Sequence, residues 1–214
     1  MGSRFFEWFQ FGVLAGLGLV GLTQAIGLRS QGVSVIVADR QRTPGQMMLD
    51  GLAFICLLVW AYEIVAYGWR FDFHVGPMGL HQVLLKSTSV KTLGAVVDSL
   101  AVLLYGTAVR RLGQSWRLGI DRTTAGPLVT EGIYRWTRHP IYVAFDLLFA
   151  GAFLVLGRLI FLVLVLLWIP LLHAYMQREE RFLSDLYGDS YRDYCDRAGR
   201  YFSWHRHDGE PNSG

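Results

Sequence analysis

Charged residues are scarce in this chain, and their scarcity excludes an ordinary soluble domain. Only 17% of the 214 residues are charged, whereas 52% are hydrophobic. A soluble domain of this size usually carries about a quarter charged residues. Because the excess apolar residues lie in blocks, we predict an integral membrane protein.

Cysteine is also rare. Cys56 lies within an apolar block and Cys195 in the polar tail, so we expect neither a disulfide framework nor a cysteine-based metal site. His74 and His81 have no evident third ligand beside them. We therefore interpret them as exposed loop histidines and predict no metal site.

The chain has no large excess of one charge. Its net charge is +3 and its pI about 9.0, which in a membrane protein mostly reflects loop arginines. We therefore expect no nucleic-acid partner. We also expect no cleavable signal peptide, because residues 5–28 are apolar enough to span and no small-residue cleavage site follows them.

Long apolar segments dominate what is present. They predict an all-α, polytopic membrane protein with five transmembrane helices and additional cytosolic C-terminal helices. The last two segments are divided only by Gly157 and Arg158, so we expect them to form a helical hairpin. The segments cover residues 5–28, 47–68, 91–109, 141–156 and 159–175.

Several features within these segments leave alternatives open. Gly12 and Gly16 form a GxxxG spacing, typical either of close helix packing or of ordinary glycine tolerance in lipid. Glu63 lies near a segment end, where we expect it to snorkel to the interface. Asp98 is either satisfied by packing or part of a site. The short apolar run 33–38 extends the first helix or lies at the interface, and whether residues 69–90 touch the membrane stays open.

The distribution of basic residues predicts the orientation. Five spans put fifteen Lys and Arg residues on the side of the C-terminus and five on the other side. The positive-inside rule places the fifteen in the cytoplasm. We divide the chain into a three-helix membrane region (1–109), a cofactor-binding catalytic region (110–202) and a polar tail (203–214).

One stretch concentrates cationic, aromatic and turn-forming residues at the start of a span. It reads LVTEGIYRWTRHPIY and covers residues 128–142. Basic residues here also suit a helix end among lipid headgroups, and His139-Pro140 suits a helix start. Together with its spacing, we interpret the stretch as the cytosolic edge of a buried site for a small charged cofactor.

Three motifs carry a family resemblance. LGQSWRLGID (112–121), the 128–142 stretch and QREERFLSDLYGDSYRDYCDR (177–197) resemble the isoprenylcysteine carboxyl methyltransferases and the related phospholipid methyltransferases. The resemblance covers about residues 110–202. It implies transfer of a methyl group from S-adenosyl-L-methionine to a lipophilic acceptor, which is a carboxylate, a thiol or an amine. The acceptor would arrive from the bilayer, and the oligomeric state stays undetermined.

The resemblance also implies the site residues. Glu179 suits the ammonium of the cofactor and His139 or Arg138 its carboxylate, while the aromatic and apolar members suit its adenine and sulfonium. We assign Arg138 and Glu180 as catalytic. The expected cofactor-binding residues are Leu128, Val129, Tyr134, His139, Pro140, Tyr142 and Glu179.

The pattern departs from the family at one position. Members that methylate prenylcysteine carry an arginine where this chain has Tyr175, although Arg178 or Arg181 could substitute for it. Two other functions stay open: an NADPH-dependent membrane reductase of the sterol type, and a non-enzymatic membrane scaffold. We expect the tyrosines at 187, 191 and 194 to be packing and interface residues.

Overall fold

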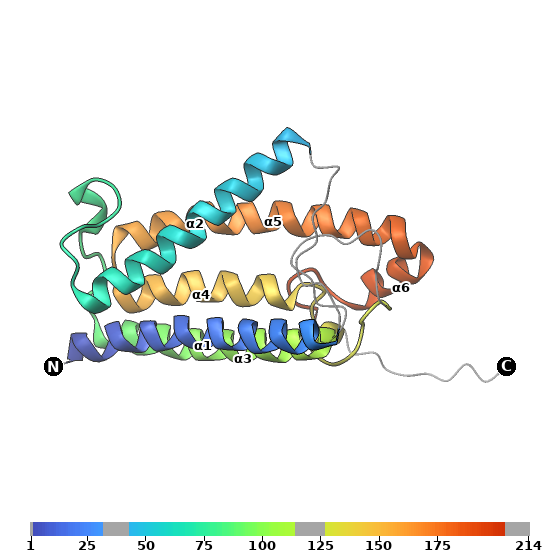
Figure 1. Ribbon diagram of the computed structural model, residues 1–214, viewed down its shortest axis with the longest axis horizontal. Coiled ribbons are helices and arrows are strands. Elements are labelled where there is room, and N and C mark those ends of the chain that lie inside the picture. Colours follow the sequence, from blue (N-terminus) through green and yellow to red (C-terminus); the bar gives the residue numbers. More distant parts are fainter. Residues whose placement is uncertain (1, 32–42, 114–126, 204–214) are drawn as a thin grey trace.

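Helices account for nearly all regular structure in the computed structural model, which describes residues 2–31, 43–113 and 127–203. The all-α prediction is therefore confirmed for these residues, while the run 33–38 lies outside them. Helices α1, α3, α4 and α5 lie along one long axis, and α2 crosses them obliquely (Figure 1). The elements are α1 (Gly2–Ser30), α2 (Pro44–Trp69), η1 (Met78–His81), α3 (Thr88–Leu112), η3 (Gly132–Arg135), α4 (Pro140–Leu156), α5 (Leu159–Tyr187) and α6 (Asp189–Arg197).

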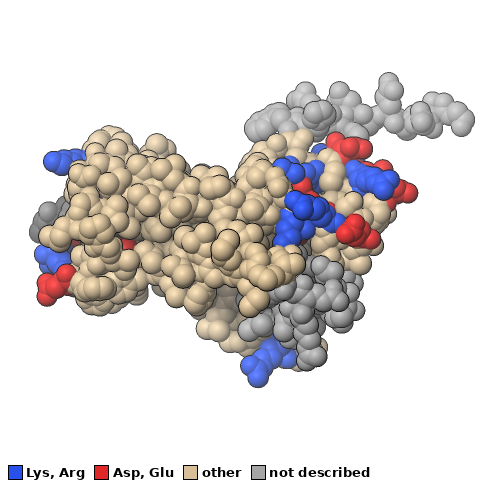
Figure 2. Space-filling view, turned by 90° about the horizontal axis from the view of Figure 1, so that it is seen from above, with Lys and Arg blue, Asp and Glu red and all other residues tan. Residues whose placement is uncertain are grey.

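Four of the described helices are long and apolar enough to cross a membrane, namely α1, α2, α3 and α5. Helix α4 is apolar but has only 17 residues, about 25 Å at 1.5 Å per residue. On the face shown in Figure 2, most charged side chains lie toward the two ends of the molecule, and the surface between them is largely uncharged. This distribution is that of a polytopic membrane protein.

Local sequence signals set the helix ends. Thr43 and Gln46 form a capping box at the start of α2, and Pro140 occupies the first turn of α4. Gly157 ends α4 at a φ of 64°, and a Cβ there would lie 2.3 Å from the Leu85 carbonyl oxygen. Glycine is therefore required at this close turn between α4 and α5. Gly188 ends α5, which continues unbroken through Pro170.

A stack of three aromatic rings ties three helices together. The Phe149 ring on α4 lies between Trp60 on α2 and Trp168 on α5, with centroid distances of 4.9 and 4.2 Å. All three side chains are buried. The stack fixes the crossing of α2 over α4 and α5 at mid-height.

The structure decides between the alternatives for the polar residues inside the helices. The snorkelling prediction for Glu63 is wrong, because its side chain is fully buried at the end of α2. The exposed-loop interpretation of the histidines is also wrong, since His74 and His81 are half-buried against Glu63. Asp98 is buried; its Oδ2 accepts a hydrogen bond from Gln10, whereas its Oδ1 has no hydrogen-bond partner among the described residues, so packing satisfies only one of its two oxygens.

The GxxxG spacing is not used for close packing within the described chain. A Cβ added at Gly12 or Gly16 would meet no described atom within 4 Å. Close approach occurs instead between α3 and α4, where a Cβ at Gly94 would lie 2.9 Å from the Val155 backbone nitrogen. At Gly151 a Cβ would lie 2.1 Å from the Asp98 carboxylate.

Candidate functional site

The start of α4 and the C-terminal half of α5 meet at the end of the bundle that carries α6 (Figure 1). The turn η3 delivers the chain to His139, and the Thr137 hydroxyl accepts a hydrogen bond from the His139 backbone N–H at 3.2 Å. Pro140 then begins the helix. The sequence Arg138-His139-Pro140, the RHP motif, thereby fixes a buried histidine at the N-cap of α4.

Glu180 on α5 gathers three cationic side chains. Its carboxylate accepts hydrogen bonds from Arg138 at 2.8 Å, from His139 Nε2 at 3.2 Å and from Arg200 at 2.5 and 3.0 Å. The Arg138 guanidinium also donates to the carbonyl oxygens of Cys195 and Ala198. This network attaches the segment after α6 to the start of α4.

Backbone contacts complete that attachment. The Arg138 N–H donates to the Gly199 carbonyl at 2.9 Å, and the Ser203 N–H donates to the Trp136 carbonyl at 2.9 Å. The Thr137 hydroxyl donates to the Arg200 carbonyl. Residues 198–203 therefore run beside the RHP motif. The paired residues are some sixty positions apart, and nothing in the sequence spacing predicts that they meet.

Glu179, the neighbour of Glu180, has a different environment. Its side chain is 34% exposed, yet its Oε2 is buried and has no hydrogen-bond partner among the described residues. His139 Nδ1 lies 3.5 Å from this oxygen, an ion-pair separation longer than a good hydrogen bond. Glu179 thus keeps acceptor capacity for a further positively charged group.

The charge on His139 follows from these two carboxylates. Burial by itself lowers the pKa of His139, but the hydrogen bond to Glu180 and the nearby negative charges of Glu179 and Glu180 outweigh burial and raise the pKa above 6.5. At neutral pH, a larger fraction of the His139 imidazole is therefore protonated than of a free histidine side chain. Since Arg138 and Arg200 already pair with Glu180, Glu179 is the carboxylate left for a positively charged ligand group.

Aromatic side chains surround Glu179 from two elements. Tyr134 of η3 is buried and has Glu179 as its electrostatic neighbour, and burial raises the pKa of Tyr134 so that its hydroxyl stays protonated. Tyr142 of α4 has Glu179, Tyr175 and Arg178 as its electrostatic neighbours, and its ring centroid lies 5.5 Å from that of His139.

Leu128 and Val129, two further predicted cofactor residues, lie beside Tyr134. Leu128 and Val129 pack, half-buried, against the cluster that contains Tyr134, Tyr191 and Tyr194. The Tyr194 hydroxyl donates to the Tyr134 carbonyl at 2.6 Å. As predicted, the tail tyrosines pack rather than face outward.

The structure thus brings every predicted site residue to one end of the bundle, around Glu179 and Glu180. It also adds residues that the sequence did not single out. Asp50 on α2 accepts a hydrogen bond from the Tyr175 hydroxyl and lies 3.8 Å from the Arg178 guanidinium. No motif links Asp50 to α5, because the pairing depends on how α2 crosses the bundle.

The site lies within a stretch that matches known proteins. Residues 90–190 match the family model described as phospholipid methyltransferase. The methanethiol S-methyltransferase 1 of Bradyrhizobium diazoefficiens is 36% identical over 78 residues, which are 36% of this chain and 26% of that protein. The protein-S-isoprenylcysteine O-methyltransferase of Schizosaccharomyces pombe is 35% identical over 96 residues, 42% of this chain and 40% of that protein. The chain therefore matches less than half the length of either relative.

A solved structure shares the fold. The eukaryotic intramembrane Ras methyltransferase, isoprenylcysteine carboxyl methyltransferase, superposes with a TM-score of 0.54 at 18% sequence identity, covering 92% of this chain and 68% of that one. Identity at this level speaks for the fold alone. Residues 90–190 thus carry the sequence pattern of the phospholipid methyltransferase family, and the resemblance to these membrane methyltransferases that the motifs predicted is confirmed.

Proposed function

We propose that this protein transfers a methyl group from S-adenosyl-L-methionine to a lipophilic acceptor within the membrane. The observation that carries the proposal is the convergence of Tyr134, His139 and Tyr142 on Glu179, whose buried Oε2 has no hydrogen-bond partner among the described residues. A carboxylate so placed fits an ammonium, and the aromatic faces around it fit an adenine or a sulfonium.

Different residues would bind different parts of the cofactor. Glu179 would bind its ammonium, and Tyr134, Tyr142, Leu128 and Val129 would contact its adenine and sulfonium. When bound, S-adenosyl-L-methionine supplies an electrophilic methyl group, so the protein has mainly to orient the acceptor and exclude water. Pro140 fixes the helix start that holds His139 in place.

Arg138 and Glu180 are better assigned as positioning residues than as reacting groups. The Arg138 guanidinium is engaged by Glu180 and by two backbone carbonyls, and Glu180 also binds His139 and Arg200. These bonds hold residues 198–203 against the RHP motif. A reductase would need free cationic side chains to bind the phosphate of NADPH. Here Arg138, His139 and Arg200 are already paired with Glu180, which disfavours a reductase.

The acceptor is more consistent with a thiol or an amine than with a carboxylate. Tyr175 occupies the position where prenylcysteine methyltransferases carry an arginine, and its hydroxyl binds Asp50. Arg178, one helical turn away, also lies beside Asp50. A carboxylate acceptor would meet the negative charge of Asp50 here. A thiolate needs no general base, whereas an amine must arrive deprotonated.

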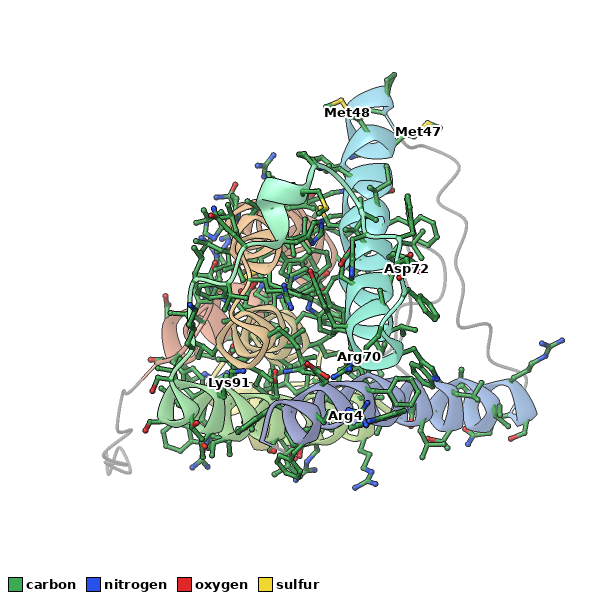
Figure 3. The ribbon with its side chains drawn as sticks, turned by 90° about the vertical axis from the view of Figure 1, so that its left-hand side faces the viewer. Arg4, Met47, Met48, Arg70, Asp72 and Lys91 are labelled. Carbon is green, nitrogen blue, oxygen red and sulfur yellow. The ribbon has the colours of Figure 1, made fainter. Side chains whose placement is uncertain are left out.

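We further propose five membrane crossings, with this site at the cytoplasmic face. Helix α4 is short, but most of its length is buried among the other helices, so lipid does not dictate its length. Helix α2 leans away from the bundle at its N-terminal end, where Met47 and Met48 point outward (Figure 3). A lipophilic acceptor would approach laterally between α2 and the start of α4.

Calorimetry of the detergent-purified protein tests the proposal. S-adenosylhomocysteine should bind with one site per chain, and NADPH should not. Glu179→Gln and His139→Ala should abolish this binding without loss of the folded state. Asp185→Asn is the matched control, because Asp185 is exposed on the same helix. Binding of neither ligand, or unchanged affinity in both site variants, would contradict the proposal.

A further inference from the structure

A second cluster of polar side chains lies at the opposite end of the bundle. Glu63, near the C-terminal end of α2, is fully buried, and the following loop folds back over it. Figure 3 looks onto this end, which Arg70 and Asp72 border. His74 Nδ1 lies 2.9 Å and His81 Nδ1 3.9 Å from the same oxygen, Glu63 Oε2. One ligand atom from each residue lies within 4.8 Å of the others.

We propose that Glu63, His74 and His81 form a binding site for a divalent transition-metal ion, with zinc as the fitting ion. Two imidazoles and one carboxylate are a ligand set that zinc takes in proteins. Bonds of about 2.0–2.1 Å in a tetrahedral arrangement separate the ligand atoms by roughly 3.3 Å. The separations of 2.9 and 3.9 Å from Oε2 lie on either side of that value, so small side-chain rotations suffice.

The surrounding backbone orients two of the ligands. The His81 Nε2–H donates to the Val75 carbonyl oxygen at 3.1 Å, and in this tautomer Nδ1 carries the lone pair. The Val75 N–H donates to Glu63 Oε1 at 2.7 Å, which leaves Oε2 to face the histidines. Such outer contacts, a backbone carbonyl on the far ring nitrogen and a donor on the far carboxylate oxygen, are typical of metal ligands.

The alternative is a hydrogen-bonded network without an ion. In it the Tyr67 hydroxyl donates to His81 Nδ1 at 2.7 Å, and the Arg158 guanidinium lies 4.2 Å from the Tyr67 ring centroid. That network pairs His74 with Glu63 but leaves His81 Nδ1 too far from Oε2 for a hydrogen bond. Since His81 Nδ1 accepts from Tyr67 and Glu63 Oε2 pairs with His74, a bound ion would replace the Tyr67 hydroxyl and the His74 proton as the partners of these two acceptors.

A metal here would fasten the loop between α2 and α3 to the helix bundle. The same loop already pairs with the turn between α4 and α5, since the Leu84 N–H donates to the Gly157 carbonyl at 2.7 Å. The Arg158 guanidinium also donates to the His81 carbonyl at 2.7 Å. The site lies far from Glu179, so it holds structure and takes no part in the proposed methyl transfer.

Metal analysis of the whole protein, purified through a tag without histidines, tests this inference. After addition of Zn²⁺ and removal of excess ion, we expect one zinc per chain. X-ray absorption should show nitrogen and oxygen neighbours at about 2.0–2.1 Å and no sulfur. Co²⁺ in its place should give a visible absorption band that Zn²⁺ abolishes. A protein with less than a tenth of an equivalent of zinc would overturn the proposal.

Three single variants place the ion. Glu63→Gln, His74→Ala and His81→Ala should each lose at least tenfold in zinc affinity. His173→Ala, at the other end of the molecule, should retain full binding. Equal binding in all four variants would show an adventitious ion and overturn the site. If a variant does not fold, the absorption spectrum of the wild-type protein still identifies or excludes the ligand set.

Discussion

At the scale of single residues, Glu180 shows how one carboxylate can hold separate segments together. Its side chain is 14% exposed and accepts hydrogen bonds from Arg138, His139 and Arg200. The first two residues lie at the start of α4, and Arg200 lies in the segment after α6. Taking away one partner of a buried ion pair leaves the others charged and uncompensated. The network should therefore determine how firmly residues 198–203 are attached to the start of α4.

Glu180→Ala should destabilise the protein by on the order of 3 kcal/mol, because Arg138 and His139 stay buried without their common acceptor. Thermal unfolding in detergent micelles measures the loss. Asp189→Ala is the control, since its bond to Arg192 is exposed on both sides and contributes little. Equal melting temperatures for the two variants would show that the network is not stabilising.

His139 should give the stability a defined pH dependence. Its pKa in the folded protein is raised above 6.5 by the two carboxylates. The stabilisation is therefore fully present below the unfolded value of 6.5 and is lost as the pH rises through the folded pKa. The melting temperature of the wild type should exceed that of His139→Gln most below pH 6.5, and the gap should narrow as the pH rises through the folded pKa. Parallel curves would contradict the raised pKa.

At the scale of elements, the contact between α3 and α4 depends on small residues. Gly94 faces Leu154 and the Val155 backbone, and Gly151 faces Asp98. Helices without a large side chain between them approach closely, which in a membrane favours packing through van der Waals contact. The GxxxG spacing of α1 has no such partner among the described residues.

Gly94→Ala should therefore destabilise the bundle by about 1–3 kcal/mol, because the added methyl meets backbone that cannot move aside at little cost. Gly16→Ala has open space and should be neutral or slightly stabilising, since alanine favours a helix more than glycine does. Unfolding midpoints of the two variants give the comparison. A destabilised Gly16→Ala protein would instead indicate that α1 packs against a second molecule.

At the scale of the whole molecule, the two ends differ in charge and in chemistry. The end with α6 carries the Glu179 and Glu180 cluster, and the other end carries Glu63 with its two histidines. On the face shown in Figure 2, a largely uncharged surface lies between them. Because a membrane protein inserts in one orientation, each site should be reached from one compartment only.

Reporter fusions should show that orientation. A reporter after Gly214 should be active in the cytoplasm, because the C-terminal side carries fifteen of the basic residues. A reporter after Phe73 should be active only on the opposite side, since the loop between α2 and α3 lies at the other end of the bundle. A C-terminal reporter that is active only outside the cytoplasm would invert the orientation and the proposed access of the cofactor.

The sequence alone determined the membrane class, the helix positions and the site motif. Apolar segment length, the capping residues at 43 and 140 and the glycines at 157 and 188 act locally, so they can be read from neighbouring letters. The RHP motif and the paired glutamates were assigned to one site through the family resemblance. Their spacing in the sequence does not by itself predict that they are in contact.

Only the tertiary structure decided which distant residues meet. It brought Arg200 to Glu180, Asp50 to Tyr175, and the loop histidines to Glu63, correcting the interpretation of Glu63 as an interfacial residue. Each of these contacts joins different elements, and their formation depends on how α2 crosses the bundle and how two loops fold back. Helix periodicity fixes which face a side chain occupies, but the crossing of helices fixes what that face meets.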